Sequence, residues 1–440
     1  MDSEGGSKRA LTVTVVLVCV IAYAAVKTYH ARRSFDRLRK QGLPVAEWSW
    51  IFGGLLTLRK HMSMFPPGAD SKYAFTEMAW KANKGGVYVD LWPFTLPVLV
   101  ISSPVLAAQM KDQNTNAKRS PGVNEGIERI TGGPSLLTLP DIHWKQWRTV
   151  FNPGFNPSYV LEQTSKIILN PMQTLRLAHN DRILRREIGA ELEKCFLERK
   201  ADMKTSSQRV KSIIALAMDA YMTENKLQEE SLDPVFKHQA STQLRLFMFA
   251  GHDTTSSTII YVYHMLSQNP DCLGRVRTEL DAVLGPDISS ASARLSNEPV
   301  LINQLHYTTA CIKETLLLYV VHLAIHRNRH YFPDPNTFNP ERWLVSADHP
   351  LRPPKEAFRP FEHGARNCIG QTLAMLELKI VLALTVREMD VVPAYEEWEK
   401  LHPSGGKIKT AFGDRAYGVS DTAGGSHAAH KYPCRVKVRV

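Results

Sequence analysis

The sequence is poor in cysteine and lacks the spacings that hold structural metals. Six cysteines are scattered along 440 residues, at positions 19, 195, 272, 311, 368 and 434. Neither a Cys-x-x-Cys pair nor a His-Glu-x-x-His string occurs, so a disulfide scaffold and a structural zinc module are excluded. The 25 glycines and 26 prolines follow no period, which excludes collagen-like and repeat folds. Hydrophobic residues make up 44% and charged residues 22%, as in globular proteins, which excludes wholesale disorder.

The chain has an excess of positive charge without the sequence features of a nucleic-acid binder. Lysine and arginine number 54 against 43 acidic residues, a formal net charge of +11. This excess favours an anionic surface or an acidic protein partner. Because no module of basic and aromatic residues accompanies it, we expect no nucleic-acid partner.

One long apolar run lies at the N-terminus. Residues Ala10–Val26 are 17 residues without a charge. A membrane-spanning helix needs about 20 apolar residues, with a lower limit near 17. The flanking Lys8, Arg9 and Lys27 can extend their charged ends to the interface. The sequence therefore predicts a transmembrane anchor over residues 10–26, with membrane lipid as a partner.

Basic residues after this run set its expected orientation. Residues 27–40 hold six lysines and arginines and one acid, whereas residues 1–9 hold two charges of each sign. The positive-inside rule then predicts a short lumenal N-terminus at 1–9, a basic linker at 27–45 and a cytosolic domain at 46–440.

Two alternatives to an anchor remain open for the apolar run. Ala22-Tyr23-Ala24 fits a small-x-small site, as in a cleaved signal peptide. The run is longer than the usual signal-peptide core of about 7–15 residues, and basic charge follows it, which favours an uncleaved anchor. A buried core helix is the second alternative, and the N-terminal position argues against it.

The rest of the chain is dominated by helical patterns. One long helix is expected over 236–268, with Asp233-Pro234 as its start, and residues 321–367 are expected to be loop. The other expected elements are strands within 84–103, mostly helix from 141 to 320, a helix at 371–388 and a strand at 435–440. This pattern predicts one large domain that is mainly α with small β-sheets (α+β).

The most specific string is Phe361-Glu362-His363-Gly364-Ala365-Arg366-Asn367-Cys368-Ile369-Gly370. Cys368 comes just before a predicted helix, where backbone N–H groups and the helix dipole can stabilise a thiolate. Gly364 and Gly370 allow a tight loop and the close approach of a flat ligand. Arg366 can bind a carboxylate, and Phe361 can shield the loop from water. A thiolate in a dry pocket is a good ligand for haem iron, whereas a lone cysteine is otherwise an inert small hydrophobe.

This string resembles the haem-ligand loop of the cytochrome P450 family, whose pattern is F-x-x-G-x-R-x-C-x-G. All five fixed positions match. The resemblance implies the P450 fold and a haem b cofactor whose iron Cys368 ligates. It also implies cofactor-binding roles for Phe361, Gly364, Arg366 and Gly370.

The string Ala250-Gly251-His252-Asp253-Thr254-Thr255 lies inside the long predicted helix. Glycine in a helix interior costs about 1 kcal/mol, and threonine can bond back to a carbonyl and bend the helix. The string resembles the family's oxygen-binding motif. That resemblance implies that Asp253 and Thr254 relay protons to dioxygen through water. A solvated helix face is the alternative.

Trp144 and Arg148 are four residues apart and would share one face of a helix. They match the family's W-x-x-x-R pattern, which implies that both contact a haem propionate. A surface arginine packed over a tryptophan is the alternative. We expect the neighbouring Trp147 to serve packing.

The sequence departs from the family pattern in three places. Leu317 stands where the family's E-x-x-R helix has arginine, so Glu314 depends on Arg342 of the string 338–343. Breaking such a buried pair destabilises a protein by about 3–5 kcal/mol. Stretches of the family pattern are also missing near Ile167 and near Val320, which implies an interrupted version of the fold.

The resemblance implies a membrane-anchored haem monooxygenase that inserts one atom of dioxygen into an apolar organic substrate. Its electrons would come from an NADPH–cytochrome reductase, with cytochrome b5 as a further donor. The implied location is the endoplasmic reticulum membrane, single-pass, with the catalytic domain in the cytosol. The chain looks most like fungal membrane-bound members, many of which serve secondary metabolism. The alternatives are an inactive or mis-spliced P450 remnant and a haem-thiolate isomerase or dehydratase.

Overall fold

The computed structural model describes residues 3–439, except for 96, 114–120, 170–180, 203–211, 223–230, 320–321, 404–405, 407 and 421–425. Both sequence gaps border excluded stretches. The first join, near Ile167, falls in a described helix at 164–169, just before the excluded residues 170–180, whereas Val320 at the second join lies outside the described residues.

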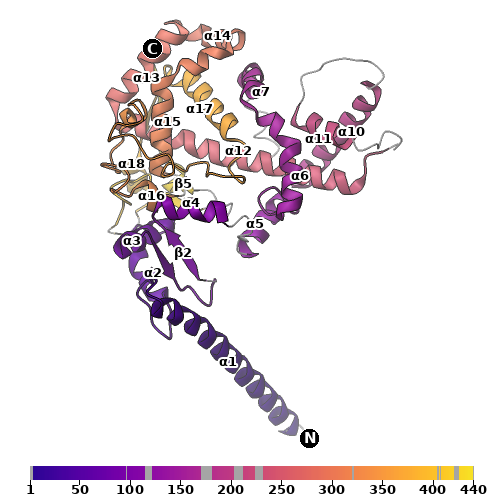
Figure 1. Cartoon of the computed structure of the whole chain (residues 1–440), viewed down its shortest axis with the longest axis vertical. Helices are drawn as coiled ribbons and strands as arrows, with labels where there is room; N and C mark the ends of the chain where they lie inside the picture. The colour runs from indigo at the N-terminus through magenta and orange to yellow at the C-terminus, as the bar shows by residue number, and fades with distance from the viewer. Residues whose placement is uncertain are drawn as a thin grey trace.

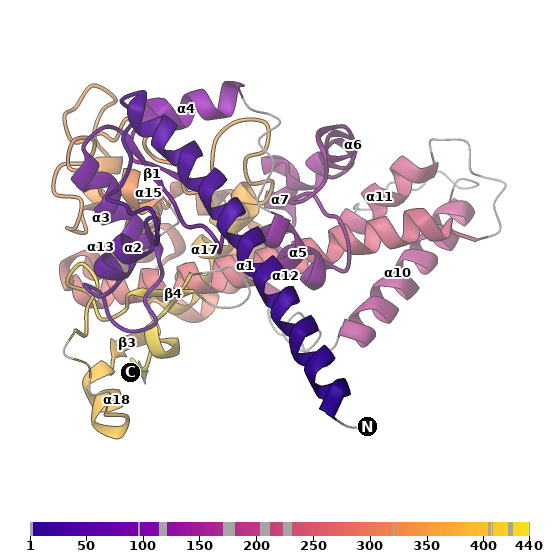
Figure 2. The same cartoon turned by 90° about the horizontal axis from the view of Figure 1, so that it is seen from below.

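Helix α1 (Ser3–Lys40) projects away from the rest of the chain in Figure 1, and its N-terminal end extends beyond the other elements in Figure 2. Its segment Leu11–Lys40 is long and apolar enough to cross a membrane, and its apolar window is fully exposed. The stretch expected to be a basic linker is helical as far as Lys40. The physical reason is its composition, because it is rich in good helix formers and has neither glycine nor proline before Gly42.

A small layer of helices and one hairpin follows α1. Strands β1 (Gly86–Val89) and β2 (Val98–Ile101) pair antiparallel, with Gly86 opposite Ile101. Both strands fall in the segment where strands were expected, so that prediction is confirmed. The hairpin contacts α3, and the helices of this layer are α2 (Leu55–Met62), α3 (Lys72–Ala82) and α4 (Pro104–Gln113).

The middle of the described chain is helical, as predicted. Its elements are α5 (Pro121–Thr131), α6 (Asp141–Phe151), η1 (Asn152–Phe155), α7 (Pro157–Glu162), α8 (Thr164–Leu169), α10 (Asp181–Asp202) and α11 (Ile213–Met222). Trp147 of α6 stacks on Phe151 and Phe236, which confirms its packing role. These aromatic contacts tie α6 to the long helix α12.

Helix α12 (Pro234–Gln268) runs through the centre of the molecule (Figure 1). Its N-cap is Asp233, whose carboxylate accepts hydrogen bonds from the backbone N–H groups of Val235 and Phe236. Pro234 occupies the first helical position, where a missing N–H does no harm. The predicted helix and its predicted start are both confirmed.

Further helices follow α12 and reach as far as Tyr319, just before residues 321–367, which were expected to be loop. They are α13 (Pro270–Leu284), η2 (Ile288–Ser290), α14 (Ala291–Asn297), η3 (Pro299–Gln304) and α15 (His306–Tyr319). Between α15 and residue 370, the described chain holds only the short turns α16 (Leu323–His326) and η4 (Pro340–Trp343). The next helix, α17 (Gln371–Thr385), ends three residues before the predicted end.

The C-terminal part adds two small sheets. Strand β3 (Met389–Pro393) pairs antiparallel with β6 (Cys434–Val438), which confirms the expected strand in the tail. Strand β4 (Gly418–Ser420) pairs with β5 (Ser426–Ala428), and Val419 lies opposite His427. The remaining elements are α18 (Tyr395–Leu401) and η5 (Ala429–Lys431).

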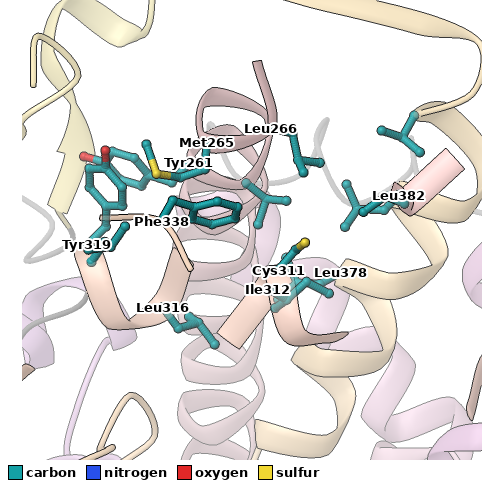
Figure 3. Close-up of a cluster of buried hydrophobic side chains, with 14 of the residues drawn as sticks. Tyr261, Met265, Leu266, Cys311, Ile312, Leu316, Tyr319, Phe338, Leu378 and Leu382 are labelled. Carbon is teal, nitrogen blue, oxygen red and sulfur yellow. The ribbon is translucent and has the colours of Figure 1, made fainter. Parts of the chain in front are cut away.

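The main core lies where α12, α15 and α17 meet (Figure 3). Tyr261 of α12 stacks on Tyr319 of α15 with ring centroids 4.0 Å apart, and Leu378 of α17 joins the same cluster. A second core joins α6, α10 and α11 to the first half of α12. Helix α12 is therefore the element shared by both cores.

Leu317, the departure from the family pattern, is fully buried in an apolar cluster with Ile325, Phe332 and Ala357. The position that carries a cation in the family is thus filled by hydrophobic packing. Burial of a leucine side chain stabilises a fold by about 1.5–3 kcal/mol. The substitution is accommodated by these neighbours.

Glu314, three residues earlier, keeps three donors within the described chain. Its carboxylate accepts hydrogen bonds from Arg342 Nε at 3.0 Å, the Asn339 N–H at 3.0 Å and Trp343 Nε1 at 2.8 Å. The predicted pair with Arg342 is confirmed, with both side chains fully buried. Burial raises the pKa of Glu314 to about 7, and the charge of Arg342 opposes that rise.

Candidate functional site

Cys368 lies in a loop that its own backbone closes just before α17. The Cys368 N–H donates to the carbonyl of Phe361 at 2.9 Å, and the Asn367 N–H donates to the carbonyl of Gly364 at 3.1 Å. Gly364 has a φ of 92°, in the left-handed region that favours glycine. Cys368 itself is exposed. The loop therefore presents its thiol outward at the start of a helix.

The surroundings of Cys368 act on its thiol in opposite directions. Desolvation is the largest influence on the pKa of Cys368 and raises it above the ordinary value. The backbone N–H of Gly370 and the charge of Arg148 lower it. A metal ion deprotonates a coordinating thiol outright, and the same N–H and cation would then stabilise the thiolate.

Helix α6 brings its predicted residues onto this loop. Arg148 donates from Nη1 to the carbonyl of Asn367 and from Nη2 to its side-chain oxygen, both at 2.8 Å. Arg366 donates to Asp141 Oδ1 at 2.5 Å, and its guanidinium carbon lies 4.7 Å from the Trp144 ring centroid. Two arginines and one tryptophan thus converge beside Cys368. Arg366 already holds a carboxylate, which is the chemistry that a propionate needs.

The string inside α12 is helical throughout, with its alcohol turned back onto the helix. Thr254 donates from Oγ1 to the carbonyl of Ala250 at 2.7 Å. Gly251 and Thr254 are exposed, and a Cβ added at Gly251 would meet no atom within 4 Å. Asp253 is instead paired with His427 of β5, with 3.1 Å between Oδ1 and Nε2. The acid and the alcohol therefore have different partners.

The surface of α12 around Gly251 and the cysteine loop belong to one region of the fold. Ile369, next to Cys368, and Ala250, next to Gly251, pack against the same hydrophobic cluster. The residues present fit haem by their chemistry. They offer a thiol, an open glycine surface for a flat ring, and arginines for two carboxylates. The Cβ-free surface at Gly251 is the structural observation behind this fit.

Two other features of the described chain were considered as a metal or cofactor site. The described residues hold no cluster of three metal-ligating side chains of the kind that His, Cys, Asp and Glu form. A cavity of about 390 Å³ lies between α7, η3 and α17, and Gln371, Met375 and Lys379 are among its lining residues. Because its lining contains none of the predicted site residues, we do not assign it to the cofactor.

Sequence reasoning missed two residues of the site. Asn367 is a variable position of the cysteine motif, yet it is the residue that Arg148 holds. His427 pairs with Asp253 from a strand far along the chain. The motif spacing contained no signal for either contact, because both depend on how distant segments meet.

Comparison with known proteins identifies the family. The family model described as Cytochrome P450 matches residues 163–322 and 317–410. The cytochrome P450 monooxygenase polC of Polytolypa hystricis is 32% identical, over 97% of this chain and 96% of that protein. Cytochrome P450 4Z1 of Homo sapiens is 30% identical, over 86% of this chain and 91% of that protein. The chain belongs to the cytochrome P450 family.

Solved structures agree on the fold. A crystal structure of a cytochrome P450, CYP102L1, superposes with a TM-score of 0.62 at 16% identity, covering 90% of this chain and 98% of that one. The haem domain of cytochrome P450DA gives a TM-score of 0.60, also at 16% identity. The predicted class, mainly α with small sheets in the P450 fold, is confirmed.

Family membership establishes the general chemistry. The chain is a P450-type monooxygenase, and the family binds a haem iron through a cysteine thiolate. Members of this family use a redox partner and act on an organic substrate. The alignment with polC runs over 534 positions, more than the 440 residues of this chain, so this chain is shorter than its relative between nearly coincident ends. This agrees with the internal gaps inferred from the sequence.

Proposed function

We propose that this chain is a membrane-anchored haem monooxygenase that inserts one oxygen atom into an apolar organic substrate, in secondary metabolism. The observation that carries the proposal is the convergence of Arg148, Arg366 and Trp144 on the exposed loop of Cys368. The relatives polC of Polytolypa hystricis and acrF of Aspergillus aculeatus are named as cytochrome P450 monooxygenases and support it.

Each predicted site residue has a role in this proposal. Cys368 ligates the iron of haem b, and the Gly370 N–H and Arg148 stabilise its thiolate. Arg148, Arg366 and Trp144 hold the propionates, which requires Arg366 to exchange Asp141, and Arg148 to exchange Asn367, for a propionate. Phe361 accepts the Cys368 N–H at its carbonyl and is one of the hydrophobic side chains packed against the main core, which anchors the cysteine loop.

The distal side of the site is formed by α12. The open surface at Gly251 leaves room for dioxygen, and the Thr254 hydroxyl is exposed there. Asp253 and Thr254 hold and move protons for the reaction through water. When bound, haem activates dioxygen and carries the electrons that the reaction consumes.

The electron donor of this proposal is an NADPH–cytochrome reductase, with cytochrome b5 as a second donor. The reductase docks on the face nearest Cys368. The net charge of +11 suits an acidic partner surface, because complementary charge accelerates encounter.

The proposal places the chain in the endoplasmic reticulum membrane as a single-pass protein, with residues 46–440 in the cytosol. An exposed apolar collar, Trp50–Phe52 with Phe94, supports this location. Ile51 is 76% exposed and Phe94 82%. Buried Arg32 of α1 fixes the collar beside the anchor, because it donates to the carbonyls of Trp50 and Ile51 at 3.0 and 3.2 Å. Tryptophan at this position is typical of a membrane interface.

The anchor is tested by extracting membranes that contain the full chain with alkaline carbonate. We expect the chain to stay with the lipid and a Val16→Glu/Val20→Glu variant to be released, because each charge at the centre of a span costs about 2.5–3.5 kcal/mol. Release of the unaltered chain would contradict the anchor and leave the monooxygenase proposal standing.

The haem site is tested by the carbon monoxide difference spectrum of the dithionite-reduced full chain. We expect the red-shifted Soret band of thiolate-ligated haem, its loss in Cys368→Ala, and its retention in the control Cys434→Ala, since Cys434 is exposed on the distant strand β6. A thiolate spectrum that survives Cys368→Ala would refute the ligand assignment.

Haem binding without turnover is the second candidate. It is favoured by the short length of the chain relative to polC. The discriminating measurement is NADPH consumption by the full chain with reductase. A thiolate spectrum without NADPH consumption would select this candidate.

A further inference from the structure

The hairpin of β4 and β5 is docked on α12 at the oxygen motif. His427 Nε2 lies 3.1 Å from Asp253 Oδ1. One helical turn further on, Ser257 donates from Oγ to the carbonyl of Ser426 at 2.7 Å. Two successive residues of β5 thus contact two residues of one helix face. The second contact fixes the strand in the position that brings His427 to the acid.

Asp253 and Thr254 do not lie on the same side of α12. Successive residues of an α-helix are about 100° apart around its axis, since a turn holds 3.6 residues. Thr254 is exposed, with its hydroxyl bonded back to Ala250, whereas Asp253 is directed at β5. The Asp253 side chain is 19% exposed and that of His427 26%. Both members of the pair are therefore partly exposed, so the pair can exchange protons with solvent.

We propose that His427 is the proton donor to Asp253, so that the relay runs from solvent through His427 and Asp253 to Thr254. The inference rests on the proposed monooxygenase function. Histidine is the side chain that takes up and releases a proton near neutral pH, which a carboxylate alone does poorly. The imidazole donates from Nε2–H to Asp253 Oδ1 and regains its proton from solvent.

The proton balance of the reaction defines what this relay must carry. One dioxygen, two electrons and two protons give one oxygen atom in the product and one water. NADPH supplies both electrons through the redox partner, and each proton passes along the relay.

The strand partner of His427 across the hairpin is Val419, and its neighbours on β5 are Ser426 and Ala428, none of which carries a charge. Asp253 is the acid that faces it from α12.

The test uses the full chain in lipid nanodiscs with reductase and NADPH, without an organic substrate. The measurement is the fraction of NADPH electrons that leaves as hydrogen peroxide rather than water. We expect His427→Gln and Asp253→Asn each to lower water formation at least tenfold, which is less than the usual contribution of about 10²–10⁴ from a proton-transfer group because water still reaches the exposed Thr254. Water formation by the double variant is no lower than by Asp253→Asn alone, because both residues serve one proton route. His402→Gln is the matched control, because His402 is an exposed histidine at the end of α18 whose ring stacks on Trp398.

Two further readouts separate a relay from a structural role. Oxidation of an added chromogenic electron donor, driven by hydrogen peroxide that already carries both protons, stays unchanged in His427→Gln. The ¹⁵N resonance of the His427 imidazole, identified by its loss in His427→Gln, shifts in Asp253→Asn even without haem. An unchanged peroxide fraction in a His427→Gln variant with a normal thiolate spectrum would overturn the relay alone. Absence of that spectrum in the unaltered chain would overturn the proposed function and the relay with it.

Discussion

Arg342 is the single cation that holds Glu314 within the described chain, and its removal is the sharpest test of how this fold replaces the missing arginine. In Arg342→Met the carboxylate keeps the Asn339 N–H and Trp343 Nε1 but loses its charge partner. Arg342 also donates to the carbonyls of Pro333 at 3.0 Å and of Asp334 and Thr337 at 3.5 Å, so the variant frees three loop carbonyls as well.

The size of the effect follows from the burial of both side chains. Removing one partner of a buried ion pair destabilises a protein by about 3–5 kcal/mol. The pKa of Glu314 is raised to about 7 from its ordinary value of 4.5, and that rise corresponds to about 3 kcal/mol at 1.36 kcal/mol per unit. The folded state thus binds this proton more tightly than the unfolded state. The contribution of Glu314 is therefore most favourable below about pH 4.5 and declines as the pH rises through 7.

The assay is urea unfolding of the full chain, followed by circular dichroism at about pH 8 and about pH 5. We expect Arg342→Met to lose about 3–5 kcal/mol at the higher pH. The loss shrinks at the lower pH, because the carboxyl then carries a proton and no longer needs a cation. The control is Arg275→Met, which removes an exposed pair with Glu341 that contributes at most about 1 kcal/mol. An equal loss for Arg342→Met at both pH values would refute this reasoning.

Three further predictions concern the core, a helix cap and the distal side. Leu317→Ala should lower the free energy of unfolding by about 2–5 kcal/mol, because the apolar cluster cannot refill the space, and a loss below 1 kcal/mol in urea unfolding would contradict this. Asp233→Ala should lower it by about 1 kcal/mol by removing the N-cap of α12, with Asp348→Ala as an exposed control. Thr254→Ala should keep the thiolate spectrum but release more peroxide per NADPH, and unchanged coupling to water would remove Thr254 from the relay.

Local patterns were sufficient to predict elements whose signals lie within a few residues. Asp233 and Pro234 predicted the start of α12 because capping and proline placement are properties of one helical turn. The cysteine motif likewise predicted its closed loop, since Gly364 adopts a conformation that other residues rarely tolerate. The basic segment after the predicted anchor continues the same helix to Lys40, because charge alone does not end a helix that lacks glycine and proline.

The sequence by itself determined the family, the mainly helical class, the apolar N-terminal helix and the composition of the cysteine loop. Only the tertiary structure decided which groups meet. It placed Leu317 in an apolar cluster rather than beside an unsatisfied carboxylate, and it paired Asp253 with His427. The physical reason is the distance along the sequence over which each kind of interaction acts. Capping, turn conformation and hydrophobic periodicity act over a few residues, whereas ion pairs and packing join segments whose approach depends on the whole fold.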